Sequence, residues 1–124
     1  MYISKFVAPE IIFGKGSINQ VGECCTRLGA SRVFLVADQG VMQYGWIEKA
    51  LFFLEHVGLD YQLWSDFSAN PRDYEVEKGA MLYTETGCDA VLAIGGGSAI
   101  DAAKAVATLS TNHGKIQDYE GIDL

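Results

Sequence analysis

The sequence predicts an α/β fold in which an open, mostly parallel sheet carries helices on both faces. Strand-like apolar runs alternate with helical patterns three or more times after the N-terminal segment. The runs over residues 33–37 and 90–94 are apolar throughout, which is typical of strands that are buried on both faces. Such strands are joined by right-handed crossovers.

The first elements are short. Residues 3–7 and 11–13 are apolar segments that fit a small hairpin or two edge strands. Ser17 and Gln20 form a capping box for a helix that ends at Gly29. This N-terminal part therefore precedes the first core strand.

The first core strand, over 33–37, is followed directly by Asp38. A second helix is predicted over 45–56, and Gly58 marks its end. Residues 60–64 are then a third candidate for a core strand.

The second half repeats the alternation. Asn70 and Pro71 form a turn, and a helix runs from Asp73 to near Gly87. The strand over 90–94 leads into a glycine turn and a helix over 98–109. After it, residues 110–124 are mostly polar and hold no further strand, so the sheet is expected to leave a pairing edge open.

Gly95, Gly96 and Gly97 connect the last strand to the last helix. This order aims backbone N–H groups at an anion, and glycines let a phosphate approach the main chain. Ser98 is the predicted N-cap, and Asp101 completes a capping box with Asp in place of Glu. The spacing matches neither GxGxxG nor GxxxxGK[ST]. It fits an anion site, and it also fits a tight turn without a ligand.

Three polar loops follow predicted strand ends: Asp38, Asn70 and residues 95–98. In open parallel sheets, ligands bind at the carboxyl ends of the strands. The sequence therefore predicts that these loops converge on one rim of the sheet.

Composition limits the function classes. The 124 residues suffice for one domain, with 49% hydrophobic and 20% charged residues. A net charge of -7 opposes nonspecific binding to nucleic acid or to an anionic membrane. The apolar runs are too short to span a membrane, and we see no secretory signal.

The cysteines and histidines suggest no catalytic centre. Cys24, Cys25 and Cys88 form no CxxC pair and read as buried structural thiols, so we expect a reduced, cytoplasmic protein. His56 and His113 are scattered, and we assign neither to a metal site.

The chain resembles the iron-dependent (group III) alcohol dehydrogenases over essentially its whole length. The match rests on the GGGSxxDxAK stretch at residues 95–104, on Asn70-Pro71 and on Asp38 after its strand. Three further segments support it, at residues 6–9, 13–16 and 118–121. Many members carry threonine where this chain has Arg72, and we assign no role to Lys104.

The resemblance implies a Rossmann-like, NAD-binding domain. The family's pyrophosphate segment corresponds to Gly96, Gly97, Ser98, Ala99, Ile100 and Asp101. Asp38 matches an acidic residue at the adenosine ribose, which favours NAD over NADP, and Asn70 matches an asparagine of the cofactor cleft. Family members commonly dimerise through their N-terminal strands, so a homodimer or higher self-association is expected.

Length separates the chain from the family. Members have several hundred residues, with a helical C-terminal domain that holds a divalent metal, iron or zinc, through one aspartate and three histidines. The family's next cofactor strand would begin after Leu124, so residues 1–124 are expected to be a partial dinucleotide-binding domain, a fragment that lacks catalytic and metal residues.

The expected function is the NAD-binding portion of an enzyme that moves hydride between an alcohol or aldehyde and NAD, and the chain alone is expected to be inactive. One alternative is a noncatalytic short form that binds nucleotide or self-assembles. Another is the N-terminal half of a glycerol or glycerol-phosphate dehydrogenase, or of a dehydroquinate synthase-like enzyme.

Overall fold

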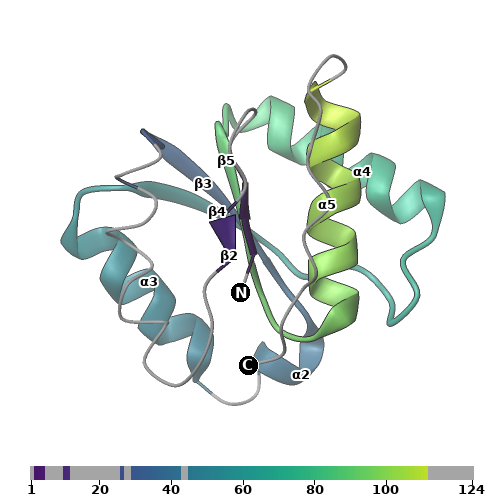
Figure 1. Cartoon of the computed structure of the whole chain (residues 1–124), viewed down its shortest axis with the longest axis horizontal. Helices are drawn as coiled ribbons and strands as arrows, with labels where there is room; N and C mark the ends of the chain where they lie inside the picture. The colour runs from purple at the N-terminus through teal and green to yellow at the C-terminus, as the bar shows by residue number, and fades with distance from the viewer. Residues whose placement is uncertain (1, 5–9, 12–25, 27–28, 43–44, 112–124) are drawn as a thin grey trace.

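The computed structural model describes residues 2–4, 10–11, 26, 29–42 and 45–111. In this part of the chain, one five-stranded sheet lies between helices on its two faces (Figure 1). Its elements are β1 (Tyr2–Ser4), β2 (Glu10–Ile11), β3 (Arg32–Ala37), α2 (Gln39–Met42), α3 (Trp46–His56), β4 (Asp60–Trp64), α4 (Asp73–Glu85), β5 (Ala90–Ile94) and α5 (Gly97–Thr111).

The strand order is β2-β1-β5-β3-β4. β3 pairs in parallel with both β4 and β5, while β1 pairs antiparallel with β5 and with β2. The predicted sheet is therefore confirmed. β3, β4 and β5 run parallel to one another, and the two short N-terminal strands pair antiparallel next to β5. The helix predicted to begin at Ser17 lies outside the described residues, except for Thr26.

One prediction about the sheet needs correction. The strand over 60–64 was expected in the core, but β4 is an outer strand, and Trp64 is its one buried residue. β5 lies between β3 and β1, and it is buried along its whole length because apolar clusters cover both of its faces. The outer strands of the described sheet are β2 and β4.

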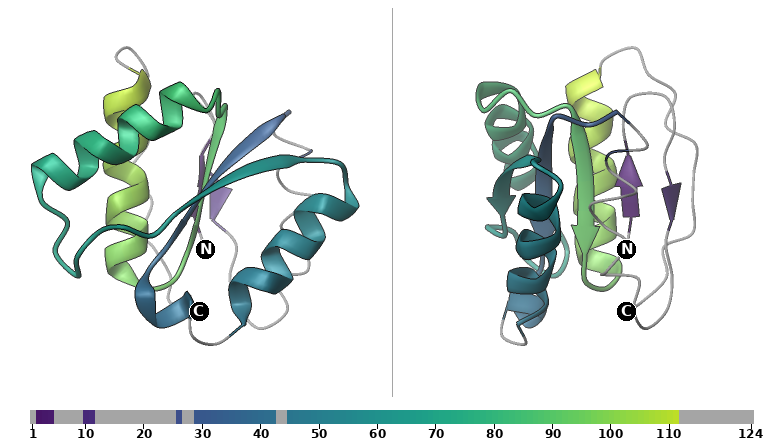
Figure 2. Two further views of the ribbon diagram at one scale, coloured as in Figure 1. Left: turned by 180° about the vertical axis from the view of Figure 1, so that it is seen from behind. Right: turned by 90° about the vertical axis from the view of Figure 1, so that its left-hand side faces the viewer.

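Alternating side chains of the core strands pack into two apolar layers, one on each face of the sheet. On one face, Val33 and Leu35 pack with residues of α3 such as Leu54. On the other, Phe34 and Val36 pack in a cluster with residues of α4 and α5. Figure 2 shows the sheet between α3 on one side and the α4–α5 pair on the other.

The α4 layer depends on one glycine. Gly79 is buried inside α4, and a Cβ there would lie 2.7 Å from ring carbons of Trp64. The Trp64 ring is itself held at centroid distances of 5.8 Å from Phe34 and 4.9 Å from Phe67. A helix-weakening residue is tolerated here because the indole of β4 lies directly against the helix backbone.

Candidate functional site

The winding of the chain reverses between β3 and β5. From β3 the chain moves to β4 on one side, and then returns to β5 on the other side of β3. Ligands of open α/β sheets bind in the crevice outside the carboxyl ends of strands at such a point. Asp38 follows β3 there, and the glycine turn follows β5. In Figure 1, α2 and the start of α5 lie together at the lower end of these strands.

The Asp38 carboxylate joins the two strand ends directly. Its Oδ2 accepts a hydrogen bond from the Gly96 N–H at 3.0 Å, and its Oδ1 accepts one from the Val41 N–H at 2.8 Å. The second bond caps the short helix α2, which the sequence analysis missed. One side chain thus fixes both the β3–α2 turn and the glycine turn.

Gly95 is required by this contact. Its φ of +143° lies in a region that L side chains rarely adopt. A Cβ at Gly95 would also collide with the Asp38 carboxylate, lying 2.9 Å from its Cγ, and would lie 3.1 Å from the Ala99 Cβ. Close approach of the carboxylate to the main chain therefore explains this glycine.

The predicted N-cap at Ser98 is wrong. α5 begins at Gly97, and the carbonyl of Gly96 accepts the Ile100 N–H at 3.2 Å. Gly96 therefore takes the capping position, and Ser98 lies in the first turn of the helix. The capping box of Ser98 with Asp101 is wrong for the same reason.

A pocket of about 240 Å³ lies at this end of the sheet. It is lined by residues from all three strand-end loops: Asp38, Gln39, Gly40, Phe67, Ser68, Ala69 and Ser98. The predicted convergence of the three loops is therefore confirmed. Gln39 follows Asp38 at a strand end and could have been proposed from that position, whereas nothing in the sequence marks Ser68.

Asn70 is placed differently from Asp38 and Ser98. It is exposed and is not among the residues that line this pocket, although its neighbours Ser68 and Ala69 are. The carbonyl oxygen of Asn70 accepts a hydrogen bond from the Ser68 hydroxyl at 3.0 Å. Asn70 thus lies in the loop that forms one wall of the pocket.

A family model described as iron-containing alcohol dehydrogenase matches residues 8–124. The chain belongs to this family. The resemblance seen in the sequence is thereby confirmed.

Relatives agree along nearly the whole chain. Alcohol dehydrogenase 4 of Schizosaccharomyces pombe is 36% identical over 124 residues, which are 99% of this chain and 29% of that protein. NAD-dependent methanol dehydrogenase of Bacillus methanolicus is 31% identical, over 95% of this chain and 31% of that protein. The chain thus spans about a third of the length of these relatives.

A solved structure shows the same fold. The crystal structure of 1,3-propanediol oxidoreductase superposes with a TM-score of 0.77 at 30% identity, covering 98% of this chain and 31% of that one. The similar region again corresponds to about a third of the larger molecule.

The first turn of α5 fits a phosphate group. The N–H groups of Gly97, Ser98 and Ala99 have no acceptor inside the helix, and helix N-termini of this kind bind anions. No atom lies within 4 Å of the position of a Cβ on Gly97, so the main chain is open there. Ile100 differs, because its N–H is bonded to Gly96 and its side chain is buried in the core.

Asp38 fits a ribose. Each of its oxygens accepts one backbone N–H, and a carboxylate has room for further hydrogen bonds. Asp38 and Ser98 line the same pocket, so an adenosine ribose at the first and a phosphate at the second would be neighbours. Asp101 is exposed, one turn further along α5.

The described residues contain no group of three or more His, Cys, Asp or Glu side chains that could hold a metal ion. They also contain no helix long and apolar enough to cross a membrane. Cys88 is buried, and this burial raises the pKa of its thiol, as befits a structural cysteine. Cys24 and Cys25 lie outside the described residues.

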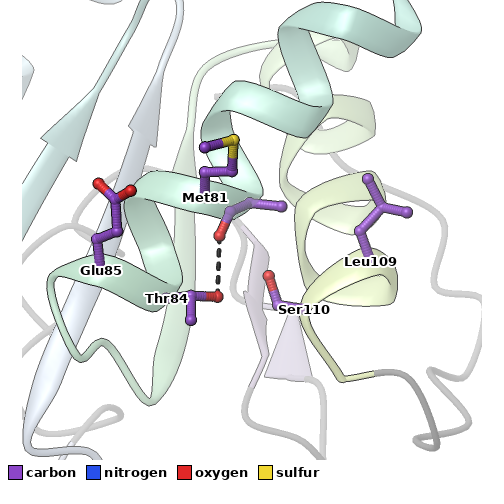
Figure 3. A pocket seen from close by; sticks show the side chains of 6 residues that line it. Met81, Thr84, Glu85, Leu109 and Ser110 are labelled. Carbon is purple, nitrogen blue, oxygen red and sulfur yellow. Dashed lines mark hydrogen bonds between the residues drawn. The ribbon is translucent and has the colours of Figure 1, made fainter.

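A larger pocket, of about 440 Å³, lies between the C-terminal parts of α4 and α5 (Figure 3). α5 leads away from the glycine turn, so this pocket is remote from the carboxyl ends of the strands. Its rim carries exposed Met81 and Leu109, and the Thr84 hydroxyl in it donates to the Ala80 carbonyl at 3.1 Å. Size alone therefore does not make it the functional site.

Proposed function

We propose that this chain is the NAD-binding portion of a metal-dependent alcohol dehydrogenase. The observation that carries the proposal is the pocket at the reversal between β3 and β5, where Asp38 and Ser98 line one cavity. When bound, NAD supplies the hydride acceptor for oxidation of an alcohol to an aldehyde, or NADH the donor for the reverse. The chain itself would bind and orient the cofactor, while the metal-binding residues would belong to another part of the enzyme.

Each proposed contact has a physical reason. The N–H groups of Gly97 and Ser98 would bind the pyrophosphate, where the helix dipole also favours negative charge. The Asp38 carboxylate would accept hydrogen bonds from the ribose hydroxyls and would repel the 2′-phosphate of NADP. The Asp38 side chain would therefore determine the preference for NAD over NADP directly.

Calorimetric titration of the 124-residue chain with NAD⁺ and NADP⁺ tests the proposal. We expect tighter binding of NAD⁺, and we expect Asp38→Asn to narrow the ratio of the two affinities by about tenfold, because hydrogen bonds to a charged group are the stronger ones. Glu77→Gln is the control, since Glu77 is exposed on α4 away from the pocket. Failure to bind either nucleotide would contradict the proposal.

We also propose that copies of this chain associate through the outer strand β2. β2 ends the described sheet and pairs there with β1, so its other side offers backbone groups for pairing. Light scattering should report a dimer or a larger assembly, and a monomer at micromolar concentration would contradict this. Replacing Ile11 by proline should shift the assembly toward monomer, because proline is poorly tolerated in a strand that pairs.

A further inference from the structure

One wall of the pocket at the carboxyl ends of the strands is formed by a loop that contacts the apolar core only at its start. This loop joins β4 to α4 and contributes Phe67, Ser68 and Ala69 to the lining. Phe67 is anchored by stacking on Trp64, at a centroid distance of 4.9 Å. Ser68 and Ala69 are exposed, so burial does not fix them.

Two polar side chains bind the loop from outside. At its start, the Gln39 Nε2 donates to the Ser65 carbonyl at 2.8 Å. In its middle, Glu75 Oε2 accepts the Ser68 N–H at 2.7 Å, and the Ser68 hydroxyl lies 3.1 and 3.2 Å from the two carboxylate oxygens. The hydroxyl has a single proton, so the backbone bond is the constant contact of this pair.

We propose that Glu75 is a positioning residue for nucleotide binding, because it holds Ser68 and Ala69 in place as the pocket wall that faces Asp38 and Ser98. The inference rests on the proposed binding of NAD in this pocket. Glu75 does not line that pocket itself; it lines a neighbouring one of about 220 Å³, to which Ser68 also contributes. Its effect on the nucleotide would therefore pass through the loop.

The charge state of Glu75 agrees with this role. The hydrogen bond from the Ser68 backbone is the main cause that holds the pKa of Glu75 below its ordinary value, and a contact with the Arg72 backbone lowers it further. Glu75 is the third residue of α4, where a carboxylate also stabilises the helix start. It is therefore ionised at neutral pH, and its loop contact is a charge-assisted hydrogen bond.

Calorimetric titration of the 124-residue chain with NAD⁺ tests the proposal in three variants. Glu75→Ala should weaken binding about three- to tenfold, because the loop must then be ordered during binding. Glu75→Gln retains an oxygen acceptor for the Ser68 N–H and should stay within about twofold of the wild type. Glu77→Ala, on the same helix, should leave the affinity unchanged.

A nuclear magnetic resonance spectrum of the unliganded variants gives a second readout. The Ser68 amide proton should shift upfield in Glu75→Ala and remain close to its wild-type position in Glu75→Gln, as expected when an acceptor is lost or kept. Ser68→Ala keeps the backbone bond and should lose less affinity than Glu75→Ala. Where Glu75→Ala folds poorly, Glu75→Leu replaces it, because leucine keeps side-chain bulk without an acceptor and the same loss of affinity is expected.

The outcomes separate the two proposals. If the wild type binds NAD⁺ and Glu75→Ala binds it equally well, the role of Glu75 is refuted while the proposed function stands. If Glu75→Gln loses as much affinity as Glu75→Ala, positioning by this hydrogen bond is likewise refuted. If the wild type binds no nucleotide, both proposals fall.

Discussion

At the amino end of the β3–β5 pair, the Asp89 carboxylate accepts the backbone N–H groups of Ser31 and Arg32, each at 3.0 Å. At the carboxyl end, the Asp38 carboxylate accepts the N–H groups of Val41 and Gly96. Both aspartates bridge a separation of 58 positions in the sequence. An aspartate carboxylate therefore links distant segments by hydrogen bonds to backbone N–H groups at both ends of this strand pair.

The surroundings of the two aspartates differ. At the amino end, the Asp89 N–H also donates to the Arg32 carbonyl, and the Arg32 guanidinium donates to the Thr86 carbonyl at 2.7 Å and pairs with Asp60 at 3.5 Å. At the carboxyl end, the first turn of α5 has N–H groups without an acceptor in the helix, beside a pocket. A similar link therefore lies next to an ion-paired arginine at one end and next to a pocket at the other, and the proposed nucleotide site involves only the second end.

Gly95→Ala should have the largest effect. Strain at its positive φ and overlap with Asp38 should together reduce the free energy of unfolding by about 3 to 4 kcal/mol. Chemical denaturation followed by circular dichroism measures this loss. Gly97→Ala is the matched control, because a Cβ there meets no atom within 4 Å. Equal losses in the two variants would show that the close approach of Asp38 to Gly95 is not the cause.

Asp89→Ala should rank second. Removing the carboxylate takes the acceptor from the N–H groups of exposed Ser31 and half-buried Arg32, where water can partly replace it, so the loss should be about 1 to 2 kcal/mol of unfolding free energy. The affinity of the folded protein for NAD⁺ should stay the same, since Asp89 lies at the other end of the strands. Calorimetry is done at a temperature where the variant is fully folded. A weaker affinity for NAD⁺ there would show that the two ends do not act independently.

Asp38→Ala should cost a similar amount of stability, about 1 to 2 kcal/mol, and should also weaken NAD⁺ binding. It removes the cap of a short helix and the acceptor of the half-buried Gly96 N–H. Denaturation and titration on the same preparation measure both effects. A stability loss of this size with unchanged affinity would show that Asp38 is a purely structural residue.

The carboxyl end could be anticipated from the sequence because its signals are local. Asp38 directly follows an apolar run, and the glycines follow another, so the topology of a parallel sheet brings them to one rim. The direct bond between Asp38 and Gly96 could not be anticipated, since it depends on the register that sets Ala37 opposite Ile94. The prediction of the N-cap was wrong because a serine near the helix start was preferred by residue type, whereas Gly96 occupies the capping position.

The amino end gave no comparable signal. Asp89 precedes an apolar run without any motif, and its bonds to Ser31 and Arg32 join distant segments. The position of β4 at the sheet edge also depends on strand order, which local patterns do not fix. Glu75 and Ser68 lie seven positions apart across a loop and a helix start, and no periodicity relates them. Long-range pairing therefore accounts for most of what the sequence analysis missed.

Alkaline pH should destabilise the amino end. Burial raises the pKa of Tyr83, near that end, from 10.0 to about 12. A phenol whose pKa is raised on folding contributes stability that is complete below pH 10 and is lost as the pH rises through 12. The denaturation midpoint of the wild type should therefore fall in this range, and Tyr83→Phe should remove part of the fall. An identical pH dependence in the two proteins would contradict the assignment to Tyr83.

Acidic pH should act on the carboxyl end, through Glu75 and its loop, with the smallest effect because water still reaches the half-buried side chain. The pKa of Glu75 is lowered from 4.5, mainly by the Ser68 backbone, so its stabilising contribution is complete above pH 4.5 and is lost as the pH falls through the lowered value. The difference in denaturation midpoint between the wild type and Glu75→Ala should shrink as the pH falls below 4.5. Glu77→Ala should show no such convergence. A constant difference between the wild type and Glu75→Ala would mean that the neutral carboxyl group holds the Ser68 loop as well as the carboxylate does, and that charge contributes nothing to this wall of the pocket.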